Sequence, residues 1–453
     1  MKKHKSILLT ISICLIVTSI VACVLLCVLL DKDGQPDVII AKDGNYNLFP
    51  DVVKRNDGTL LSVYYSSQGG HAPYKFGDDL GTIRYTIGSK NGKNWDNPQD
   101  LVNQYELENW GLGVWYSQIE NQYYYKDSGN TKHYSLDGST KTYIDDLPSD
   151  ATFAVEARDP NLAKLGDGTL IFTFFTRLPW QSQLGGHTYW TENDSFYTWG
   201  RTFIMYSVDN GNSWSAPTEV QCNSLDRNCA KRGNIAVYDD GTMLIPMYGM
   251  STSATDTFAR DKWSTANVRG KLVFEDENNK TNANGTWQWL KEYSTQSVDG
   301  KDASVQSVFG YGVTEASFGV ASDGKTTYAM LRFHKSQTPG GDILVSKDYG
   351  ETWTTIANSS PNSQQAGWCL LDNGNFFVTW SQVPVPRPVY GNIFNPELGW
   401  DSSSAKVLYK TDKETGDMAD PSSVQLDNGK ILVIFYDSNI KAIGGVFCSQ
   451  YSW

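Results

Sequence analysis

Three carboxylates recur at the same place in a repeated pattern. Asp159, Glu315 and Asp420 each stand nine residues before the glycine of an Asp-Gly or Asn-Gly doublet. Carboxylates gathered at one site can act as general acids, general bases or nucleophiles. The alternative is a set of solvated residues lining a channel. The residues at the other three equivalent positions are Phe49, Arg232 and Gln365.

The doublets also indicate which elements carry these acids. Each one precedes an apolar, strand-like run, and successive glycines lie 50 to 110 residues apart, which is enough for one four-stranded sheet per repeat. Six such sheets predict an all-β, six-bladed β-propeller, with the three acids at the starts of inner strands that face its central mouth. The doublets are Asp57-Gly58, Asp167-Gly168, Asp240-Gly241, Asp323-Gly324, Asn373-Gly374 and Asn428-Gly429.

Composition agrees with a single globular propeller over residues 34–453. Hydrophobic residues make up 40% of the chain and aromatic residues 13%, and the 40 glycines suit many short strands and tight turns. The net charge is −12, and no basic cluster lies outside the N-terminus, which argues against nucleic acid as a partner. An anionic ligand therefore requires a local arginine pocket.

The N-terminus predicts a membrane anchor. Residues 7–30 carry no charge, lysines precede them and aspartates follow them. A helix of this length reaches roughly 36 Å, more than a bilayer core of about 30 Å. The charge bias places residues 1–33 as a cytoplasmic tail and transmembrane signal anchor, with the C-terminal domain extracellular or lumenal. A cleaved signal peptide is the alternative, because the residues up to Cys23 resemble a lipoprotein cleavage box.

Cysteines and sequons fit a secretory route. Cys222 and Cys229 are close enough in the chain for a loop disulfide, whereas Cys369 and Cys448 are expected to be small buried residues. No Cys-x-x-Cys pair or histidine cluster indicates a metal site, and no cofactor is expected. Four Asn-x-Ser/Thr triplets begin at Asn193, Asn279, Asn284 and Asn358.

Two segments read Ser-x-Asp-x-Gly-x-Ser/Thr-Trp, at residues 207–214 and 346–353, and residues 88–95 form a weaker copy with Lys90 in place of the aspartate. In such a turn the Asp and Ser side chains bond the backbone, glycine takes a positive φ and tryptophan packs into the sheet. These segments resemble the Asp-boxes of sialidases, also called neuraminidases. The resemblance covers about residues 155–437, implies a glycoside hydrolase acting on glycans, and places the Asp-boxes far from the mouth.

The resemblance also assigns residues to the site. Arg158, in Arg-Asp-Pro, is similar to the family's Arg-Ile-Pro arginine, which binds the substrate carboxylate, and Arg177 matches a second arginine of that pocket. The segment around Glu315 resembles the one whose glutamate assists the nucleophile. Arg332 and Arg387 then fall where the other two arginines of the family's triad are expected. Guanidinium groups bind carboxylates in bidentate fashion, although strand-end salt bridges are the alternative for Arg332 and Arg387.

The departures from the family pattern concern the reacting groups. Asp420 stands where the family has its nucleophilic tyrosine. Tyrosine suits a sialoside because a neutral phenol approaches a carboxylate-bearing anomeric carbon without repulsion, so an aspartate suits an uncharged centre better. The acid/base aspartate is also missing from the expected segment, and His187, Asp159 and Asp194 are the nearest substitutes. Tyr311 is a candidate replacement nucleophile.

His187 has a counterpart in the preceding repeat. The run Leu-Gly-Gly-His-Thr-Tyr-Trp around it echoes Gln-Gly-Gly-His-Ala-Pro-Tyr around His71. A histidine at the mouth can donate a proton or bond a sugar hydroxyl, and a loop histidine capping a glycine turn is the alternative. The aromatic stretch 109–125, in a long insertion before Arg158, is a further binding candidate.

The leading hypothesis is a membrane-anchored exo-glycoside hydrolase that removes terminal sugars, sialic or otherwise acidic, from cell-surface glycans. Glu315 and Asp420 would be the carboxyl pair, and the reaction retains or inverts configuration according to whether Asp420 is nucleophile or base. A glycosidase for a non-sialic sugar, a glycan receptor that has lost catalysis and a protein-interaction platform are the alternatives.

Overall fold

The chain folds almost entirely into antiparallel β-structure. Helix α2 (Gln104–Asn109) and two short 3₁₀ turns, η4 (Ser402–Ser404) and η5 (Gln450–Ser452), are the only helical elements among the described residues. The computed structural model describes residues 34–70, 80–126, 132–135, 142–178, 200–231, 233–251, 263–294, 313–333, 343–357, 365–381, 387–411 and 418–453.

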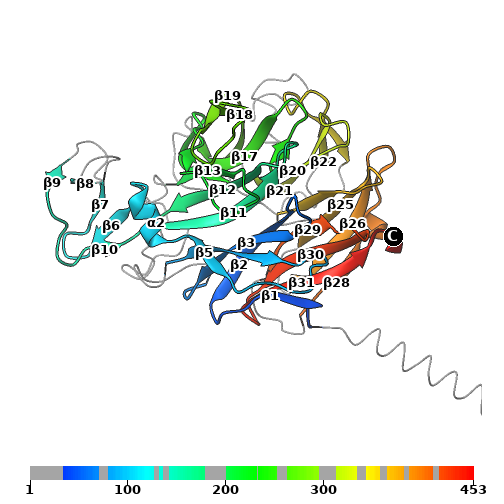
Figure 1. The fold of residues 1–453 in the computed structure, drawn as a ribbon, viewed down its shortest axis with the longest axis horizontal. Coiled ribbons are helices and arrows are strands. Elements are labelled where there is room, and N and C mark those ends of the chain that lie inside the picture. Colours follow the sequence, from blue (N-terminus) through cyan, green and yellow to red (C-terminus); the bar gives the residue numbers. More distant parts are fainter. Residues whose placement is uncertain are drawn as a thin grey trace, which may run out of the picture.

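Six sheets repeat one plan and succeed one another around the molecule in chain order, as the colours of Figure 1 show. We call them blades 1 to 6. Blades 1 and 2 comprise β2 (Tyr46–Lys54), β3 (Leu60–Ser67), β4 (Thr82–Gly88) and β5 (Gln99–Val102), then β11 (Glu156–Lys164), β12 (Leu170–Arg177), β13 (Arg201–Ser207) and β14 (Thr218–Glu219).

Blades 3 and 4 comprise β15 (Leu225–Lys231), β16 (Ala236–Val237), β17 (Thr242–Ser251), β18 (Trp263–Phe274) and β19 (Gly285–Ser294), then β20 (Val313–Val320), β21 (Thr327–Phe333), β22 (Ile343–Ser346) and β23 (Thr354–Ala357). Blade 5 comprises β24 (Gly367–Leu370), β25 (Phe376–Ser381), β26 (Val389–Asn395), β27 (Gly399–Trp400) and β28 (Lys406–Tyr409).

Blade 6 joins the two ends of the chain. Its inner strands are β29 (Met418–Gln425), β30 (Lys430–Asp437) and β31 (Ala442–Ser449), and its outermost strand is β1 (Val38–Ala41) from the N-terminal side. β1 pairs antiparallel with β31, with Val38 opposite Gly445. Because β29 also contacts β2 of blade 1, the ring of blades closes here. The predicted all-β propeller is thereby confirmed at the level of its sheets.

Inner strands of four blades contain the same irregularity at the same place in the repeat. At each of these sites the inner strand advances by three residues while its partner strand advances by two. The sites lie between Leu48 and Asp51, Arg158 and Asn161, Thr314 and Ser317, and Ala419 and Ser422. Each is a β-bulge, which bends a strand and redirects one side chain. The bulges lie where these strands begin, the end of the ring that we call the mouth.

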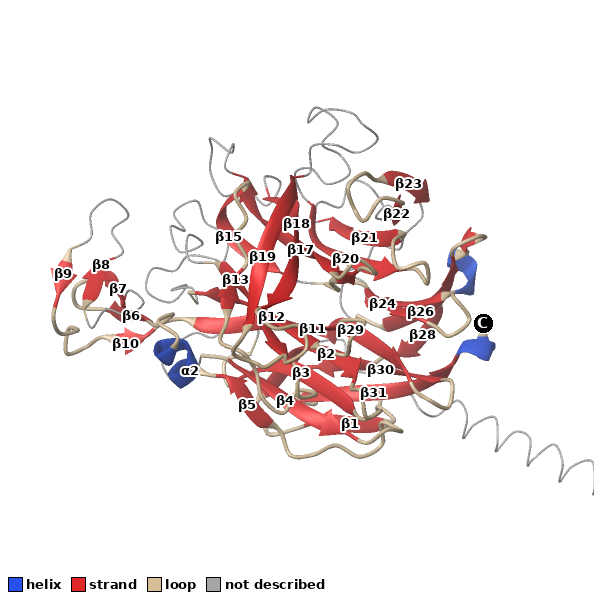
Figure 2. Cartoon of the chain, turned by 45° about the horizontal axis from the view of Figure 1, so that its top comes forward, coloured by secondary structure: helices blue, strands red, loops and turns tan. Residues whose placement is uncertain are grey.

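A seventh sheet is inserted between blades 1 and 2. Its order is β10-β6-β7-β8-β9, and Figure 2 shows it projecting from the side of the propeller beside α2. The aromatic stretch singled out in the sequence contributes to this inserted sheet. Its strands are β6 (Val114–Ser117), β7 (Gln122–Lys126), β8 (His133–Ser135), β9 (Tyr143–Ile144) and β10 (Thr152–Phe153).

Both Asp-boxes form the expected turns on the underside, opposite the mouth. Asp348 accepts hydrogen bonds from Ser346 Oγ at 2.7 Å, Thr352 N at 2.9 Å and Thr352 Oγ1 at 2.6 Å, and Trp353 stacks on Phe318 at 5.6 Å. Asp209 is held in the same way by Ser207 and Ser213. In the weaker copy, Asn91 rather than Lys90 accepts the turn's hydrogen bonds, from Ser89 and from the amide of Lys93.

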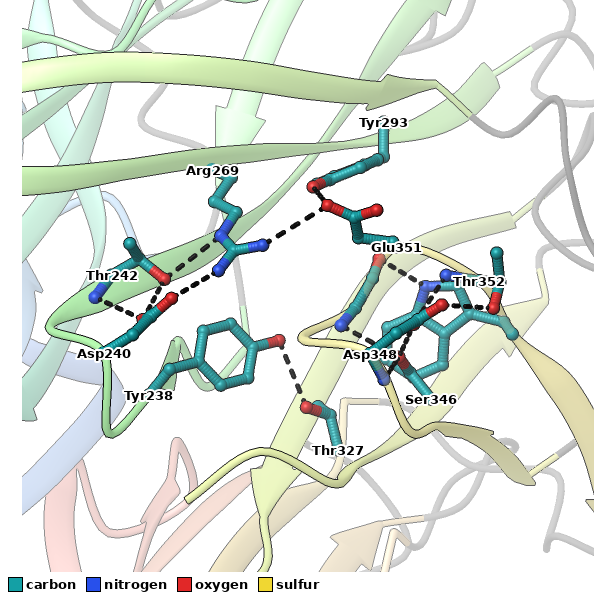
Figure 3. A network of polar contacts seen from close by, with 12 residues as sticks. Tyr238, Asp240, Thr242, Arg269, Tyr293, Thr327, Ser346, Asp348, Glu351 and Thr352 are labelled. Atoms are coloured by element: carbon teal, nitrogen blue, oxygen red, sulfur yellow. Dashed lines mark hydrogen bonds and ion pairs between the residues drawn. The ribbon is translucent and has the colours of Figure 1, made fainter.

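An ionic network ties the underside of blade 3 to the Asp-box of blade 4 (Figure 3). Arg269 donates to Asp240 Oδ2 at 2.7 Å and to Thr242 Oγ1 at 3.1 Å, and its third guanidinium nitrogen lies 3.5 Å from Glu351 Oε1. Tyr293 donates to the same Glu351 carboxylate at 2.9 Å. The network therefore holds two blades in register at the end opposite the bulges.

No helix among the residues that the structure describes is long and apolar enough to cross a membrane. Residues 1–33 lie outside the described part, so the anchor and its topology remain predictions.

Candidate functional site

The predicted acids occupy the bulges of the inner strands. Asp159, Glu315 and Asp420 have φ of 45°, 50° and 52°, and Phe49 in blade 1 has 55°. All four side chains are at most 5% exposed. A left-handed conformation costs a non-glycine residue about 1–3 kcal/mol and persists mainly where surrounding structure enforces it, often at functional sites. Three blades therefore present a carboxylate in one strained geometry at the mouth.

A second set of polar residues, seven before five of the six turn glycines, locks these bulges in place. Asp51 Oδ2 accepts hydrogen bonds from the amide of Leu162 at 2.7 Å and from Asn161 Nδ2 at 3.2 Å. Asp51 Oδ1 accepts from Ser422 Oγ at 2.6 Å. One buried carboxylate thus connects the inner strands of blades 1, 2 and 6. On the other side of the ring, Ser317 donates to Asn234 Oδ1 at 3.1 Å.

Two of the predicted arginines share one buried glutamate. Glu156 is fully buried; its Oε1 lies 3.5 Å from Arg158 Nη1 and 3.1 Å from Arg177 Nη2, and it accepts a hydrogen bond from Arg177 Nε at 3.2 Å. The other oxygen accepts from Tyr65 Oη at 2.7 Å and from the amide of Gly81 at 2.9 Å. Burial raises the pKa of the Tyr65 phenol, so it remains a neutral donor at physiological pH.

Arg158 is the more enclosed of the two arginines. Its side chain is 2% exposed, and its guanidinium carbon lies 4.7 Å from the ring centroid of Tyr65 and 5.1 Å from that of Phe49. Arg177, at the end of β12, keeps 13% of its side chain exposed. Only Arg177 of this pair therefore offers appreciable surface to a ligand.

Gly81 makes this packing possible. A Cβ on Gly81 would lie 1.8 Å from Tyr65 Cε2, so any side chain there would displace the phenol that donates to Glu156. Glu156, Tyr65 and Asp51 were not predicted from the sequence. The signals available for them were an acidic residue two positions before Arg158 and, for Asp51, its fixed place in the repeat.

Across the mouth, Glu315 forms an ion pair with Arg332. The bulge places Thr314, not Glu315, opposite Arg332 in the β20–β21 register, so the pair bridges the bulge. Arg332 keeps 18% of its side chain exposed, and Glu315 keeps 5%. This ion pair is the strand-end salt bridge expected as the alternative for Arg332, and the binding role of Arg332 stays a prediction. Arg387 is half-buried between β25 and β26.

Several candidates lie outside the described residues, namely His71, His187, Asp194, Arg232 and Tyr311, and the side chain of Cys229 does as well. The proposed Cys222–Cys229 disulfide therefore stays a prediction; Cys222 Sγ lies 3.4 Å from Glu292 Oε1. Within the described ranges no group of three or more His, Cys, Asp and Glu side chains could hold a metal ion.

Comparisons with known proteins place the fold. No protein-family model and no curated protein sequence matches the chain. Among solved structures, a protein of unknown function from Dyadobacter fermentans matches with a TM-score of 0.58 at 16% identity, covering 91% of this chain and 97% of its own. A Hadza microbial sialidase matches with a TM-score of 0.54 at 12% identity, covering 90% of this chain and 66% of its own.

An intramolecular trans-sialidase from Ruminococcus gnavus also matches, with a TM-score of 0.52 at 11% identity, over 91% of this chain and 97% of its own. Identities this low establish the fold alone. The chain has a sialidase-like β-propeller fold, as its Asp-boxes and repeat predict.

Proposed function

We propose that this sialidase-like propeller is an exo-glycoside hydrolase that removes terminal, acidic sugars from glycans. The observation that carries the proposal is the repeated bulge, which sets Asp159, Glu315 and Asp420 in the same strained conformation at the mouth. A propeller mouth normally favours uncharged interior residues, and carboxylates in enforced geometry are the groups that glycoside hydrolysis uses.

Glu315 and Asp420 are assigned as the carboxyl pair. Glu315 pairs with Arg332, and its carboxyl group is assigned as a proton acceptor. Asp420 then acts as nucleophile, with retention of configuration, or as the base that activates water, with inversion. Asp159 is assigned as the acid that protonates the leaving oxygen, with His187 as its alternative.

The arginines limit the choice of sugar. Arg177 and Arg332 keep exposed surface and are assigned to a carboxylate or to hydroxyls of the substrate. Arg158, enclosed with Glu156, is assigned to the same pocket at a greater depth. Because Glu156 already neutralises part of the charge on Arg158 and Arg177, a weakly acidic or polyhydroxylated sugar suits this pocket as well as a sialic acid does.

A glycan receptor is the second candidate, and Glu156 is the observation that favours it. The Glu156 carboxylate binds the guanidinium groups of Arg158 and Arg177, which would otherwise be available to a ligand. In addition, Asp420 stands where sialidases have their nucleophilic tyrosine. A receptor binds without turnover and needs no acid–base pair.

Turnover of a glycoside panel tests the proposal. Residues 34–453 are incubated with a fluorogenic α-sialoside and with neutral and uronic aryl glycosides, with Glu315→Gln and Asp420→Asn as comparison variants. We expect turnover of at least one acidic glycoside and a loss of more than 100-fold in either variant. Binding without turnover across the panel would favour the receptor. For any substrate that is cleaved, the anomer formed first, followed by NMR, separates retention from inversion.

We further propose that residues 7–30 anchor the protein in a membrane with the propeller outside the cytosol. The uncharged run and the flanking charges support this. Alkaline carbonate extraction should leave the full chain in the membrane pellet, and external protease should digest the propeller on intact cells. A mature chain whose first residue is Cys23, whether soluble or lipid-modified, would contradict the uncleaved anchor.

A further inference from the structure

One face of the inserted sheet carries aligned tyrosines. Tyr116 of β6 faces Tyr123 of β7, Tyr125 of β7 faces Tyr134 of β8, and Tyr134 faces Tyr143 of β9. The ring centroids of these pairs lie 4.8, 5.8 and 6.0 Å apart. We call Tyr125, Tyr134 and Tyr143 the tyrosine row.

The aligned tyrosines become more exposed toward the outer edge of the sheet. Tyr116 and Tyr123 are 4% and 7% exposed and belong to the core between blades 1 and 2. Tyr125 and Tyr134 are half-buried, and Tyr143 is 41% exposed. In Figure 1, β8 and β9 lie farthest from the propeller. Large aromatic surface kept in water at such an edge is typical of a binding surface.

The opposite face already supplies the inserted sheet with a core of its own. Trp115 packs edge-on against Phe153 at 5.6 Å and against His133 at 5.2 Å. Trp115 and Tyr124 are 8% and 4% exposed. The outer members of the tyrosine row are therefore not needed to bury the sheet.

We propose that the tyrosine row is a carbohydrate-binding platform, separate from the mouth, for internal sugars of a glycan chain. The choice of a glycan rests on the proposed function. Pyranose rings present apolar faces that stack on aromatic rings, while phenol hydroxyls bond sugar hydroxyls at the ring edge. Lys132 Nζ lies 4.1 Å from the Tyr143 ring centroid and adds a donor at the outer end, where it also pairs with Asp145 at 3.5 Å.

The platform is fixed to the strand that carries the candidate site. Only Ala154 and Val155 separate β10 from Glu156, and both are fully buried. The amide of Ala154 donates to Val114 O at 2.7 Å, so the connection continues the sheet. A glycoconjugate bound at the platform is thereby kept near the mouth, which raises the effective concentration of its chain ends there.

Binding to an immobilised, sialylated mucin-type glycoprotein tests the platform by surface plasmon resonance. The full chain is used in detergent, on a Glu315→Gln background so that the glycans are not consumed. We expect Tyr134→Ala combined with Tyr143→Ala to weaken binding at least tenfold. Tyr143→Phe should weaken binding far less, because the stacking ring remains and only the hydroxyl contact is lost. Tyr105→Ala is the matched control: Tyr105 is 68% exposed on α2, outside the row.

Turnover of a small aryl glycoside by the same Tyr variants with Glu315 intact separates the platform from the mouth. The platform predicts unchanged turnover of the small substrate. Binding by the double variant equal to that of the Tyr105 control would overturn the inference, and so would an equal loss of small-substrate turnover. If no variant, nor the parent, cleaves any glycoside while the row variants still lose glycoprotein binding, the hydrolase proposal fails and the platform stands.

Discussion

At the scale of single residues, Glu156 determines the charge state of the candidate site. It is the counter-ion of Arg158 and Arg177 and the acceptor for Tyr65. A buried carboxylate is stable only while its cationic and hydrogen-bonding partners remain, because a buried charge that loses its partner is left uncompensated.

Glu156→Gln should therefore destabilise the protein. Glutamine can still accept hydrogen bonds from Tyr65 and Gly81 but leaves two arginines without their counter-charge, and removal of one partner from a buried pair costs about 3–5 kcal/mol. Urea unfolding measures the loss. Tyr65→Phe, which keeps the carboxylate, should cost about 1 kcal/mol. Equal stability of the two variants would show that charge compensation is not what Glu156 provides.

At the scale of elements, the bulge of β29 holds Asp420 at φ 52°. Asp420→Gly should be more stable than Asp420→Ala by about 1 kcal/mol, because both lose the same carboxylate and only alanine carries a Cβ in the left-handed region. Thermal unfolding compares the two variants.

Ser423, three residues along the same strand, provides a control at which the order of stability of the glycine and alanine variants should be reversed. It lies past the bulge without a positive φ, so Ser423→Gly should be less stable than Ser423→Ala by about 0.5–1 kcal/mol. If glycine were inferior at both positions, the bulge at Asp420 would carry no strain.

The Asp-box of blade 4 should make the stability of the protein depend on pH in the acidic range. Burial alone would raise the pKa of Asp348, but hydrogen bonds from Thr352 and Ser346 outweigh it and hold the pKa below its ordinary value. A lowered folded-state pKa contributes stability that is complete above the unfolded value, about 3.9, and is lost as pH falls through the folded value. The melting temperatures of the parent and Asp348→Asn should therefore converge below about pH 4. A gap that persists undiminished to pH 2 would exclude this linkage.

The turns and strands could be predicted from the sequence because they depend on residues that are close together in the chain. The doublets and Asp-boxes specify turns through glycine φ and Asp side-chain bonds, and the structure has them where the pattern places them. Asn91 in the weaker box, the bulges and the pairing of β1 with β31 depend on contacts between distant segments, which spacing alone does not reveal.

The site was predictable to a similar degree. Repeat spacing brought Asp159, Glu315 and Asp420 to equivalent places, and the bulges give all three the same conformation. Glu156 was missed because its importance arises from Tyr65 and Gly81, which approach from blade 1 across 91 and 75 residues of chain. Long-range partners of this kind leave no periodic mark in the sequence.

At the scale of the whole molecule, the N-terminal strand completes the ring. Ile40 and Ala41 of β1 are 3% exposed, and Ile40 packs into the core of blades 6 and 1. A chain that begins at residue 42 should therefore unfold at a lower temperature and be cut faster by protease than one that begins at residue 34. A synthetic peptide of residues 34–44 should restore part of the loss by adding back the missing strand. Identical melting of the two truncated chains would mean that the ring does not need β1.

The position of β1 also bears on mechanical load. It is the first strand after the predicted anchor, so tension between a membrane and a glycan held at the mouth would enter the propeller through the pairing of β1 with β31. The ladder is only four residues long and contains an irregularity between Ile39 and Ala41. Under a pull on the N-terminus, this short ladder would be the first to part. The propeller would then open at the seam between its two chain ends, while the bulges and the Glu156 cluster of the other blades stayed intact.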